Sequence, residues 1–457
     1  MKKQLILIML CLIAVLISVS TVSAASYYVN DTNGNDFTNT GGINDPFKTI
    51  YKGVSSATDG DTVNIAAGTY TGNNNKDIQI DKDITIQGAG QNQTIIDSSG
   101  TKAFTIASGT NVTITGLTIK NANGSAIMSS GGGENPTISI NQCTFINNSW
   151  PGLDKYGGAI SFIGTMTVNG CTFINNTAEY GGAIAAEGDV NIIGSLFTGN
   201  SAEYGGAIYN YEGIMNITGC NFYNNKATEH GAAVYGAWPE SVSTTFIKYS
   251  RFVNNLVGTT QQDLYLENPI EAIDQVGAAQ GESTMTATLN WWGDNNGPTA
   301  TRVESRNSNI PIIYSPWLVM NIKADPTTIN TGQTSTVKAD VYTDSAGVNH
   351  SADAVQFFSG PEVTFTSQLG KIGSYTITVP WVLGQAVRTY HGVLAGVDHV
   401  TAADGVQVVS TPITVIQAPV ANAASNTVGM QETGLPIAGL VLAVLALFGG
   451  LATSKRK

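Results

Sequence analysis

Cysteine, histidine and charge are all scarce in this sequence. Its 457 residues include four cysteines and four histidines, and only 12% of the residues are charged. Cys11 lies in an apolar N-terminal stretch, whereas the other three cysteines share one position of a repeat with two serines: Cys143, Cys171, Cys220, Ser195 and Ser250. An odd number of cysteines in equivalent positions argues against a disulfide framework and predicts a row of small side chains.

If any pair of these cysteines forms a disulfide, it is Cys143 with Cys171, one repeat apart. Metal binding by cysteine is not expected, because neighbouring histidines and close spacing are missing.

Basic residues are also few. Lysine and arginine number 21 against 33 aspartates and glutamates, which gives a formal net charge of −12. This balance argues against a nucleic-acid partner and against binding to anionic membrane surfaces. Helical periodicity is rare, while the 51 glycines and many Asn, Ser and Thr residues are typical of a β-rich surface protein.

The chain repeats itself between residues 141 and 255. The phrase Cys-Thr-Phe-Ile-Asn-Asn at 143–148 returns at 171–176, and looser copies follow at 195–200, 220–225 and 250–255. A second phrase, Tyr-Gly-Gly-Ala-Ile, begins at Tyr156, Tyr180 and Tyr204, and it returns in altered form at His230. A period of about 25 residues predicts stacked units that cannot bury their apolar sides alone. Short alternating strands broken by Gly and Asn favour a parallel β-solenoid, in which each strand pairs with its counterpart one coil later.

Equivalent residues of such a solenoid should stack in rows. One expected row is an apolar column in the interior: Phe145, Phe173, Phe197, Phe222 and Phe252. The other is a ladder of side-chain amides at a corner, where asparagine tolerates the left-handed conformation: Asn148, Asn176, Asn200, Asn225 and Asn255.

These phrases resemble the repeats of chlamydial polymorphic outer-membrane proteins, and the layout of the whole chain is similar to that of adhesin-like surface proteins of methanogenic archaea. The resemblance implies an all-β protein whose main part is a right-handed parallel β-helix of the pectate-lyase-like kind. It also implies a role at the cell surface.

The two ends carry targeting signals. Residues 1–25 have the basic start, apolar core and small-residue cleavage site of a signal peptide, with a retained anchor helix as the alternative. Residues 417–434 are a linker, and residues 435–454 form an apolar stretch long enough to be a transmembrane helix. The basic tail at 455–457 should stay in the cytoplasm, so the protein is expected to be anchored at the cell surface. Processing of this end by a sortase-like enzyme is the alternative.

Three folded parts are expected between these signals. Residues 26–76 form an N-terminal cap with a short helix that starts at Asp45 as N-cap and ends near Val54. The buried face of this helix would consist of Phe47, Ile50, Tyr51 and Val54. Residues 77–315 form the β-helix, with about eight or nine coils. Residues 316–416 form a β-sandwich that resembles the invasin/intimin-type Ig-like domain.

Two groups of aromatic residues are candidates for ligand binding. Tyr156, Tyr180 and Tyr204 form a row that would offer an aromatic strip to sugar rings if it faced outward, and would be core if it faced inward. Trp291 and Trp292 either plug the end of the β-helix core or form a sugar-stacking pair.

Calcium is the one cofactor that the sequence suggests, at two places. Glu179, Glu203 and Glu229 stand at equivalent repeat positions, either as a solvated face or as a divalent-cation site. Asp31, Asn33 and Asn35 alternate as in a calcium-binding loop, or else they form Asx-turns.

Eight sequons make the protein a candidate glycoprotein: Asn30, Asn92, Asn111, Asn123, Asn147, Asn175, Asn216 and Asn349. Asn147 and Asn175 precede the ladder asparagines, so their side chains are expected to face outward.

The implied fold also hosts pectate lyases and polygalacturonases, but no catalytic residue stands out. The aspartates are scattered and share no repeat position, and His230 replaces a tyrosine of the row. We therefore expect no enzyme, but an adhesin-like surface protein whose partners are glycans or other cell-surface proteins. The alternatives are a polysaccharide-acting lyase, hydrolase or epimerase on the same scaffold, and a purely structural envelope component.

Overall fold

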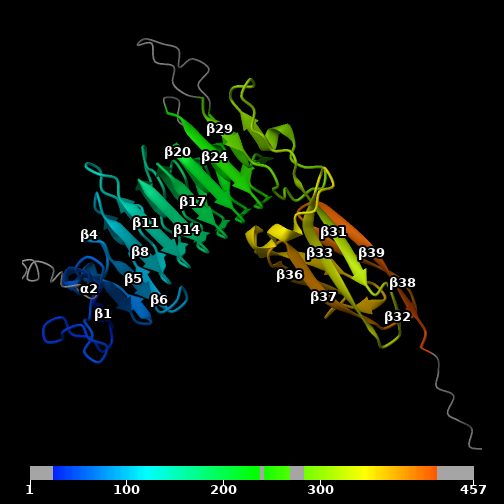
Figure 1. Ribbon diagram of the computed structural model, residues 1–457, viewed down its shortest axis with the longest axis horizontal. Helices are drawn as coiled ribbons and strands as arrows, with labels where there is room; N and C mark the ends of the chain where they lie inside the picture. The colour runs from blue at the N-terminus through cyan, green and yellow to red at the C-terminus, as the bar shows by residue number, and fades with distance from the viewer. Residues whose placement is uncertain (1–23, 237–240, 268–281, 419–457) are drawn as a thin grey trace, which may run out of the picture. The chain divides into compact units, whose positions relative to one another are not determined.

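The computed structural model describes residues 24–236, 241–267 and 282–418, and strands dominate these ranges (Figure 1). Nearly all of the predicted signal peptide, nearly all of the linker, the transmembrane helix and the basic tail lie outside them. Within the described ranges no helix has the length and apolar character needed to cross a membrane. The membrane anchor at 435–454 therefore stays a prediction.

The described residues between 26 and 305 form a parallel β-helix with three long sheets, and Figure 1 shows strands of sheet 1 side by side. Sheet 1 contains β1 (Ser26–Val29), β2 (Thr62–Ile65), β5 (Thr85–Gly88), β8 (Asn111–Thr115), β11 (Thr137–Asn141), β14 (Thr165–Asn169), β17 (Val190–Ile193), β20 (Ile208–Thr218), β24 (Ser243–Lys248) and β29 (Thr284–Thr286). Sheet 2 contains β4 (Ile78–Ile80), β7 (Phe104–Ile106), β10 (Ile127–Ser129), β13 (Ile160–Ile163), β16 (Ile184–Glu187), the start of β20, β23 (Val234–Gly236), β28 (Leu264–Leu266) and β30 (Val303–Ser305). Sheet 3 contains β3 (Gly68–Tyr70), β6 (Thr94–Asp97), β9 (Thr118–Lys120), β12 (Thr144–Ile146), β15 (Thr172–Ile174), β18 (Leu196–Thr198), β21 (Asn221–Tyr223) and β25 (Arg251–Val253).

The phenylalanine column is confirmed. The five rings pair in register along sheet 3, with centroids 4.7–5.0 Å apart and planes within 6° of parallel. All five side chains are fully buried. The ring spacing equals the separation of neighbouring strands, so each coil extends the same column by one ring.

The asparagine ladder is also confirmed. The first four amides each donate from Nδ2 to Oδ1 of the next ladder residue at 3.0 Å, and the same Oδ1 also accepts the backbone N–H of the ladder asparagine that donates to it. The left-handed conformation, however, was assigned to the wrong residue. It falls on the residue before each ladder asparagine, as at Asn147 (φ 53°), Asn175 (φ 53°) and Gly199 (φ 67°).

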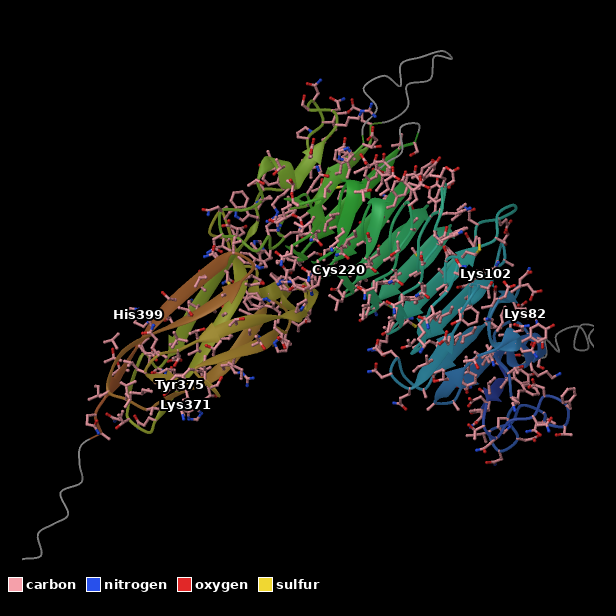
Figure 2. The ribbon with its side chains drawn as sticks, turned by 180° about the vertical axis from the view of Figure 1, so that it is seen from behind. Lys82, Lys102, Cys220, Lys371, Tyr375 and His399 are labelled. Atoms are coloured by element: carbon pink, nitrogen blue, oxygen red, sulfur yellow. The ribbon has the colours of Figure 1, made fainter. Side chains whose placement is uncertain are left out.

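The cysteines form the predicted row of small side chains, and all three are free and buried (Figure 2 labels Cys220). The row has a function that the sequence did not reveal. The N–H of Cys143 donates to Sγ of Cys171 at 3.4 Å, and the N–H of Cys171 donates to Oγ of Ser195 at 3.1 Å. Ser250 accepts the N–H of Cys220 in the same way. Cysteine and serine can replace each other in this row because either can accept a backbone hydrogen bond from the preceding coil.

The cap helix begins later than predicted. Helix α2 spans Ile50–Ser56, and its N-cap is Thr49, whose side chain accepts the N–H of Lys52. Asp45 instead accepts hydrogen bonds from Thr40. The chain from Asp45 stays extended because Phe47 bridges to Val29 of β1. Phe47, Ile50 and Val54 are buried as predicted, but Tyr51 is 56% exposed.

Two further sheets lie beyond residue 316 and enclose a second core. One contains β31 (Leu318–Asp325), β33 (Thr334–Asp344), β37 (Gln385–Gly392) and β35 (Gly370–Lys371). The other contains β32 (Thr328–Asn330), β39 (Gln407–Ile416), β38 (Gly396–Asp404), β34 (Gly360–Thr366) and β36 (Thr376–Trp381). This arrangement is a β-sandwich, and its likeness to an invasin/intimin-type Ig-like domain remains a prediction.

Trp291 and Trp292 are buried, so the sugar-stacking prediction for them was wrong. Trp292 is 1% exposed and stacks on Phe252 at 4.7 Å, which closes the phenylalanine column as a plug. Trp291 is fully buried, and its indole N–H donates to Oδ2 of Asp404 at 2.7 Å. Asp404 also forms a buried ion pair with Arg251. Neither indole ring presents a face to a ligand in solution.

Candidate ligand-binding site

The outer face of sheet 2 carries a column of aromatic side chains. Ile160 and its counterparts point into the core, so the next residue of each strand points outward. These outward residues pair in register from one coil to the next: Ser161, Ala185, Tyr209, Tyr235 and Tyr265. The column thus changes from small side chains to tyrosines after Ala185.

The predicted tyrosine row lies against this column. Tyr156 stacks on Tyr180 at 4.8 Å, and Tyr180 stacks on Tyr204 at 5.5 Å. Tyr180 also contacts Tyr209 at 5.2 Å, and the next coil places His230 on Tyr265 at 3.9 Å. The two sets form an aromatic cluster separate from the β-helix core. The row is therefore neither an open strip nor part of the central core.

The exposure of the row varies along its length. Tyr180 is only 7% exposed, so its ring cannot serve as an open platform for a sugar. Tyr156 and Tyr204 are half-buried. A hollow lies at the N-terminal end of the row, beside Tyr156.

A hollow of about 280 Å³ opens at this end, where Ser161 and Ala185 replace the tyrosines of the column. Its walls include Tyr156, Tyr211 and Glu187. The rings of Tyr156 and Tyr211 lie 6.4 Å apart at 86° to each other. The hollow is close to the lower size limit of about 300 Å³ for small-molecule sites in proteins.

Tyr211 reaches the hollow because β20 contains a β-bulge. Ala186 pairs with Asn210 and Glu187 pairs with Glu212, so Tyr211 is the extra residue between them. A bulge turns a side chain away from the regular alternation of its strand. This places the Tyr211 ring beside the preceding coil, where the outward column has only small side chains.

The surroundings of the cluster are acidic. Burial raises the pKa of Glu187, and the neighbouring carboxylate of Glu212 raises it further. Burial raises the pKa of Tyr204 most, and the negative charge of Glu203 raises it further. The pKa of Tyr265 rises to about 12, mainly through burial and then through Glu267. These tyrosines remain neutral hydrogen-bonding groups at neutral pH.

The predicted cation sites are only partly aligned. The N–H of Glu203 donates to the carbonyl of Glu179 at 2.9 Å, but the register of the next pairing shifts between Ala202 and Tyr204, so Glu203 and Glu229 are not a register pair. In the other loop, Oδ1 of Asn35 accepts two backbone N–H groups in an Asx-turn, while Asp31 and Asn33 stand nearby in the sequence. In the described parts of the chain, no three His, Cys, Asp or Glu side chains lie together as metal ligands. Calcium binding stays a prediction at both places.

Most of the sequons lie on the surface. Asn147 and Asn175 are exposed, as expected from their positions before the ladder. The other exposed acceptors are Asn92, Asn111, Asn123 and Asn349. Asn30 and Asn216 are partly buried, and Nδ2 of Asn216 donates to Asn191.

The sequence reasoning missed Tyr209, Tyr211 and Glu187. A signal for Tyr209 was present, because the residue after the Gly-Gly-Ala-Ile phrase changes from Ser161 to Ala185 to Tyr209. A signal for the bulge was also present, because the repeat lengthens by one residue in the coil that contains it. Successive ladder asparagines are 24 residues apart between Asn176 and Asn200, but 25 residues apart between Asn200 and Asn225.

Comparison with known proteins supports the fold. Residues 84–268 match a family model described as a right handed beta helix region. The matched residues include the regular coils and the hollow. This part of the chain is therefore a right-handed parallel β-helix.

Similar solved structures include an S-layer protein and a lyase. Domains 4 and 5 of the S-layer protein SbsC are 23% identical, with a TM-score of 0.16 over 23% of this chain and 57% of that chain. A structure of SbsC domains 1–6 is 24% identical, with a TM-score of 0.17 over 25% of this chain and 15% of that chain. A rhamnogalacturonan lyase is 12% identical, with a TM-score of 0.36 over 64% of this chain and 88% of that chain. These scores are low, so we transfer no activity from these structures. No curated protein matches the sequence.

Proposed function

We propose that this protein is an adhesin-like surface protein that binds glycans in the hollow between Tyr156 and Tyr211. The observation that carries the proposal is the interruption of a filled aromatic column by two small residues, Ser161 and Ala185. A cavity with aromatic walls and a few polar groups suits a sugar ring, which has an apolar face and a polar edge. The hydroxyl group of Ser161 and the carboxylate of Glu187 also line the hollow and supply polar groups for the sugar hydroxyls.

The predicted signal peptide and the apolar stretch at 435–454 support display outside the cell with a membrane anchor. The acidic charge balance agrees with export. In this proposal, the sandwich at 316–416 is an Ig-like stalk and the exposed sequons are glycosylation sites. The archaeal relationship rests on the resemblance of the repeat phrases and of the chain layout.

We propose binding without catalysis. Glu187 is the acidic residue among those lining the hollow, and neither lysine nor arginine lines it. Lyase chemistry on uronates needs a base beside acidic calcium ligands, and the lining does not supply that combination. One observation favours the alternative of a polysaccharide hydrolase: Glu187 and Glu212 are register partners on neighbouring strands, and glycosidases use two carboxyl groups.

A glycan array probed with the purified full chain tests the proposal. We expect saturable binding to a subset of glycans, and we expect Tyr211→Leu to weaken it at least tenfold. Tyr51→Leu is the matched control, because Tyr51 is exposed on the cap helix, away from the hollow. Binding that is unchanged in Tyr211→Leu would refute this site, and binding to no glycan would favour a structural envelope role.

An assay for new reducing ends and unsaturated uronates, run on the same glycans, separates binding from catalysis. We expect no product. Product formation that Glu187→Gln abolishes would replace the binding proposal with the hydrolase.

A further inference from the structure

The two tyrosines of the hollow form two sides of a cage. Their rings are nearly perpendicular, with centroids 6.4 Å apart, and both line the same hollow, so a group bound there lies beside two aromatic rings. The faces of aromatic rings are negative, and they attract a cation within about 6 Å of the ring centroid. Tyrosine walls of this kind recognise substituted ammonium groups better than neutral groups of the same shape.

Glu187 adds a negative charge to the same hollow. Among the described residues, none of the lysine, arginine and histidine side chains forms an ion pair with it. The basic residue next to Tyr156 is Lys155, and its Nζ lies over the ring of Trp150 at 5.4 Å. The neighbouring Glu212 makes the surroundings of Glu187 still more negative. A half-buried carboxylate without a cationic partner is stabilised when a cation binds beside it.

We infer that the hollow binds a substituted ammonium group, held between the rings of Tyr156 and Tyr211 and beside the carboxylate of Glu187. The inference rests on the proposed glycan site and narrows its ligand class. The ammonium group has two possible sources. It belongs either to an amino sugar with a free amine or to a methylated amine such as choline.

Calorimetric titration of the purified full chain with matched pairs of probes tests the inference without any mutation. Choline is compared with 3,3-dimethylbutan-1-ol, which has the same shape and no charge. Glucosamine is compared with glucose and with N-acetylglucosamine. We expect the charged member of at least one pair to bind at least tenfold more tightly than its neutral counterpart.

The order of the two charged probes identifies the source. Tighter binding of glucosamine assigns the ammonium group to a sugar, and tighter binding of choline assigns it to a methylated amine. Both results support the inference. Equal affinity for the charged and neutral members of both pairs would overturn it. The proposal of glycan binding would not be affected by that result, because the glycan array tests it separately.

Two variants with the same change in net charge show whether the preference for a cation arises in the hollow. Glu187→Gln should lower the affinity for the preferred cation about tenfold. Glu362→Gln should leave the affinity unchanged, because Glu362 is exposed in the sandwich. Equal losses in the two variants would show attraction by net charge alone and would contradict binding in the hollow.

Discussion

The two asparagines of an Asn-Asn pair have different roles in this β-helix. Asn176 is fully buried and belongs to the ladder, while Asn175 is exposed and takes the left-handed turn. The turn is needed because the chain changes direction after each strand of sheet 3. The buried side-chain amide then satisfies backbone groups that the turn leaves without partners.

Replacing Asn176 by alanine should therefore lower the free energy of unfolding by about 1–3 kcal/mol. The change removes the oxygen that accepts both the backbone N–H and the Nδ2 of Asn148, all in a buried place. Chemical denaturation measures the loss. Asn175→Gly is the control and should change stability by less than about 0.5 kcal/mol, because Gly199 already takes the same left-handed turn. Equal losses in both variants would contradict the division of roles.

The row of cysteines and serines leads to a second prediction. Cys171→Ser should cost less than about 1 kcal/mol, because serine already fills this position at Ser195 and Ser250 and accepts the same bond. Cys171→Val should cost about 1–3 kcal/mol, because the N–H of Cys143 then loses its acceptor. The two unfolding curves should be compared directly. A valine variant as stable as the serine variant would show that the hydrogen bond contributes nothing.

The sequence alone predicted the membership of both ladders, because identical residues at a fixed period must stack in a solenoid. It did not predict which asparagine would be left-handed, since Asn147 and Asn148 have the same intrinsic preference. Their packing in the folded coil decides the matter. The cysteine row was predicted as a set of small side chains, but its hydrogen bonds depend on the orientation of backbone N–H groups that composition does not reveal.

At the scale of elements, the departures from the predictions occur where tertiary contacts override local preference. Asp45 and Pro46 are good residues for starting a helix, yet the chain there stays extended because Phe47 pairs with β1. In β20, one extra residue creates the bulge that places Tyr211 at the hollow. The period of the repeat could have revealed the extra residue. The direction of its side chain could not have been derived, because it follows from the pairing of Glu187 with Glu212.

A buried carboxylate between two elements of the sandwich makes stability depend on pH. Asp398 of β38 is 1% exposed. Burial raises its pKa, but hydrogen bonds from four donors lower it by more, so the pKa lies below the ordinary value of 3.8. The donors are the backbone N–H groups of Gln368, Leu369 and Gly370 and the hydroxyl of Tyr390. The folded state therefore binds the Asp398 proton less readily than the unfolded state.

This contribution to stability is present above the unfolded pKa and disappears as the pH falls through the lower folded pKa. Denaturation curves at a series of pH values below 3.8 should show a steeper loss of stability in the natural chain than in Asp398→Asn. Glu362→Gln, an exposed change elsewhere in the sandwich, should keep the steep dependence. If Asp398→Asn kept it as well, the acid sensitivity would have to come from another group.

At the scale of the whole molecule, the all-β class and the right-handed β-helix were accessible from the sequence. Repeats and turn residues are patterns of composition and spacing, whereas the apolar stretches near the two ends stay predictions. The plug formed by Trp292 was predicted as one of two alternatives, and burial decides between them. The hollow was not predicted, because it is defined by side chains from neighbouring coils whose registers must first be known.

The predicted membrane topology of the chain can be tested on intact cells. If the signal peptide and the apolar stretch act as predicted, residues 26–434 lie outside the cell. Protease added to intact cells should then remove this region, and the C-terminal fragment should remain with the membrane. Lysed cells provide the control for protease activity. Protection of residues 26–434 in intact cells would contradict surface display.

The asparagine ladder ends at a carboxylate. Asn255 donates from Nδ2 to Asp263 at 2.8 Å, and Arg302 forms an ion pair with Asp263. Between Asn148 and Asn255, each ladder residue offers its neighbour the same amide donor and acceptor. A coil inserted into or removed from this stretch would leave the other hydrogen bonds of the ladder in place and would change the stack by a rise of about 4.8 Å. The length of the ladder can therefore change without a change of fold.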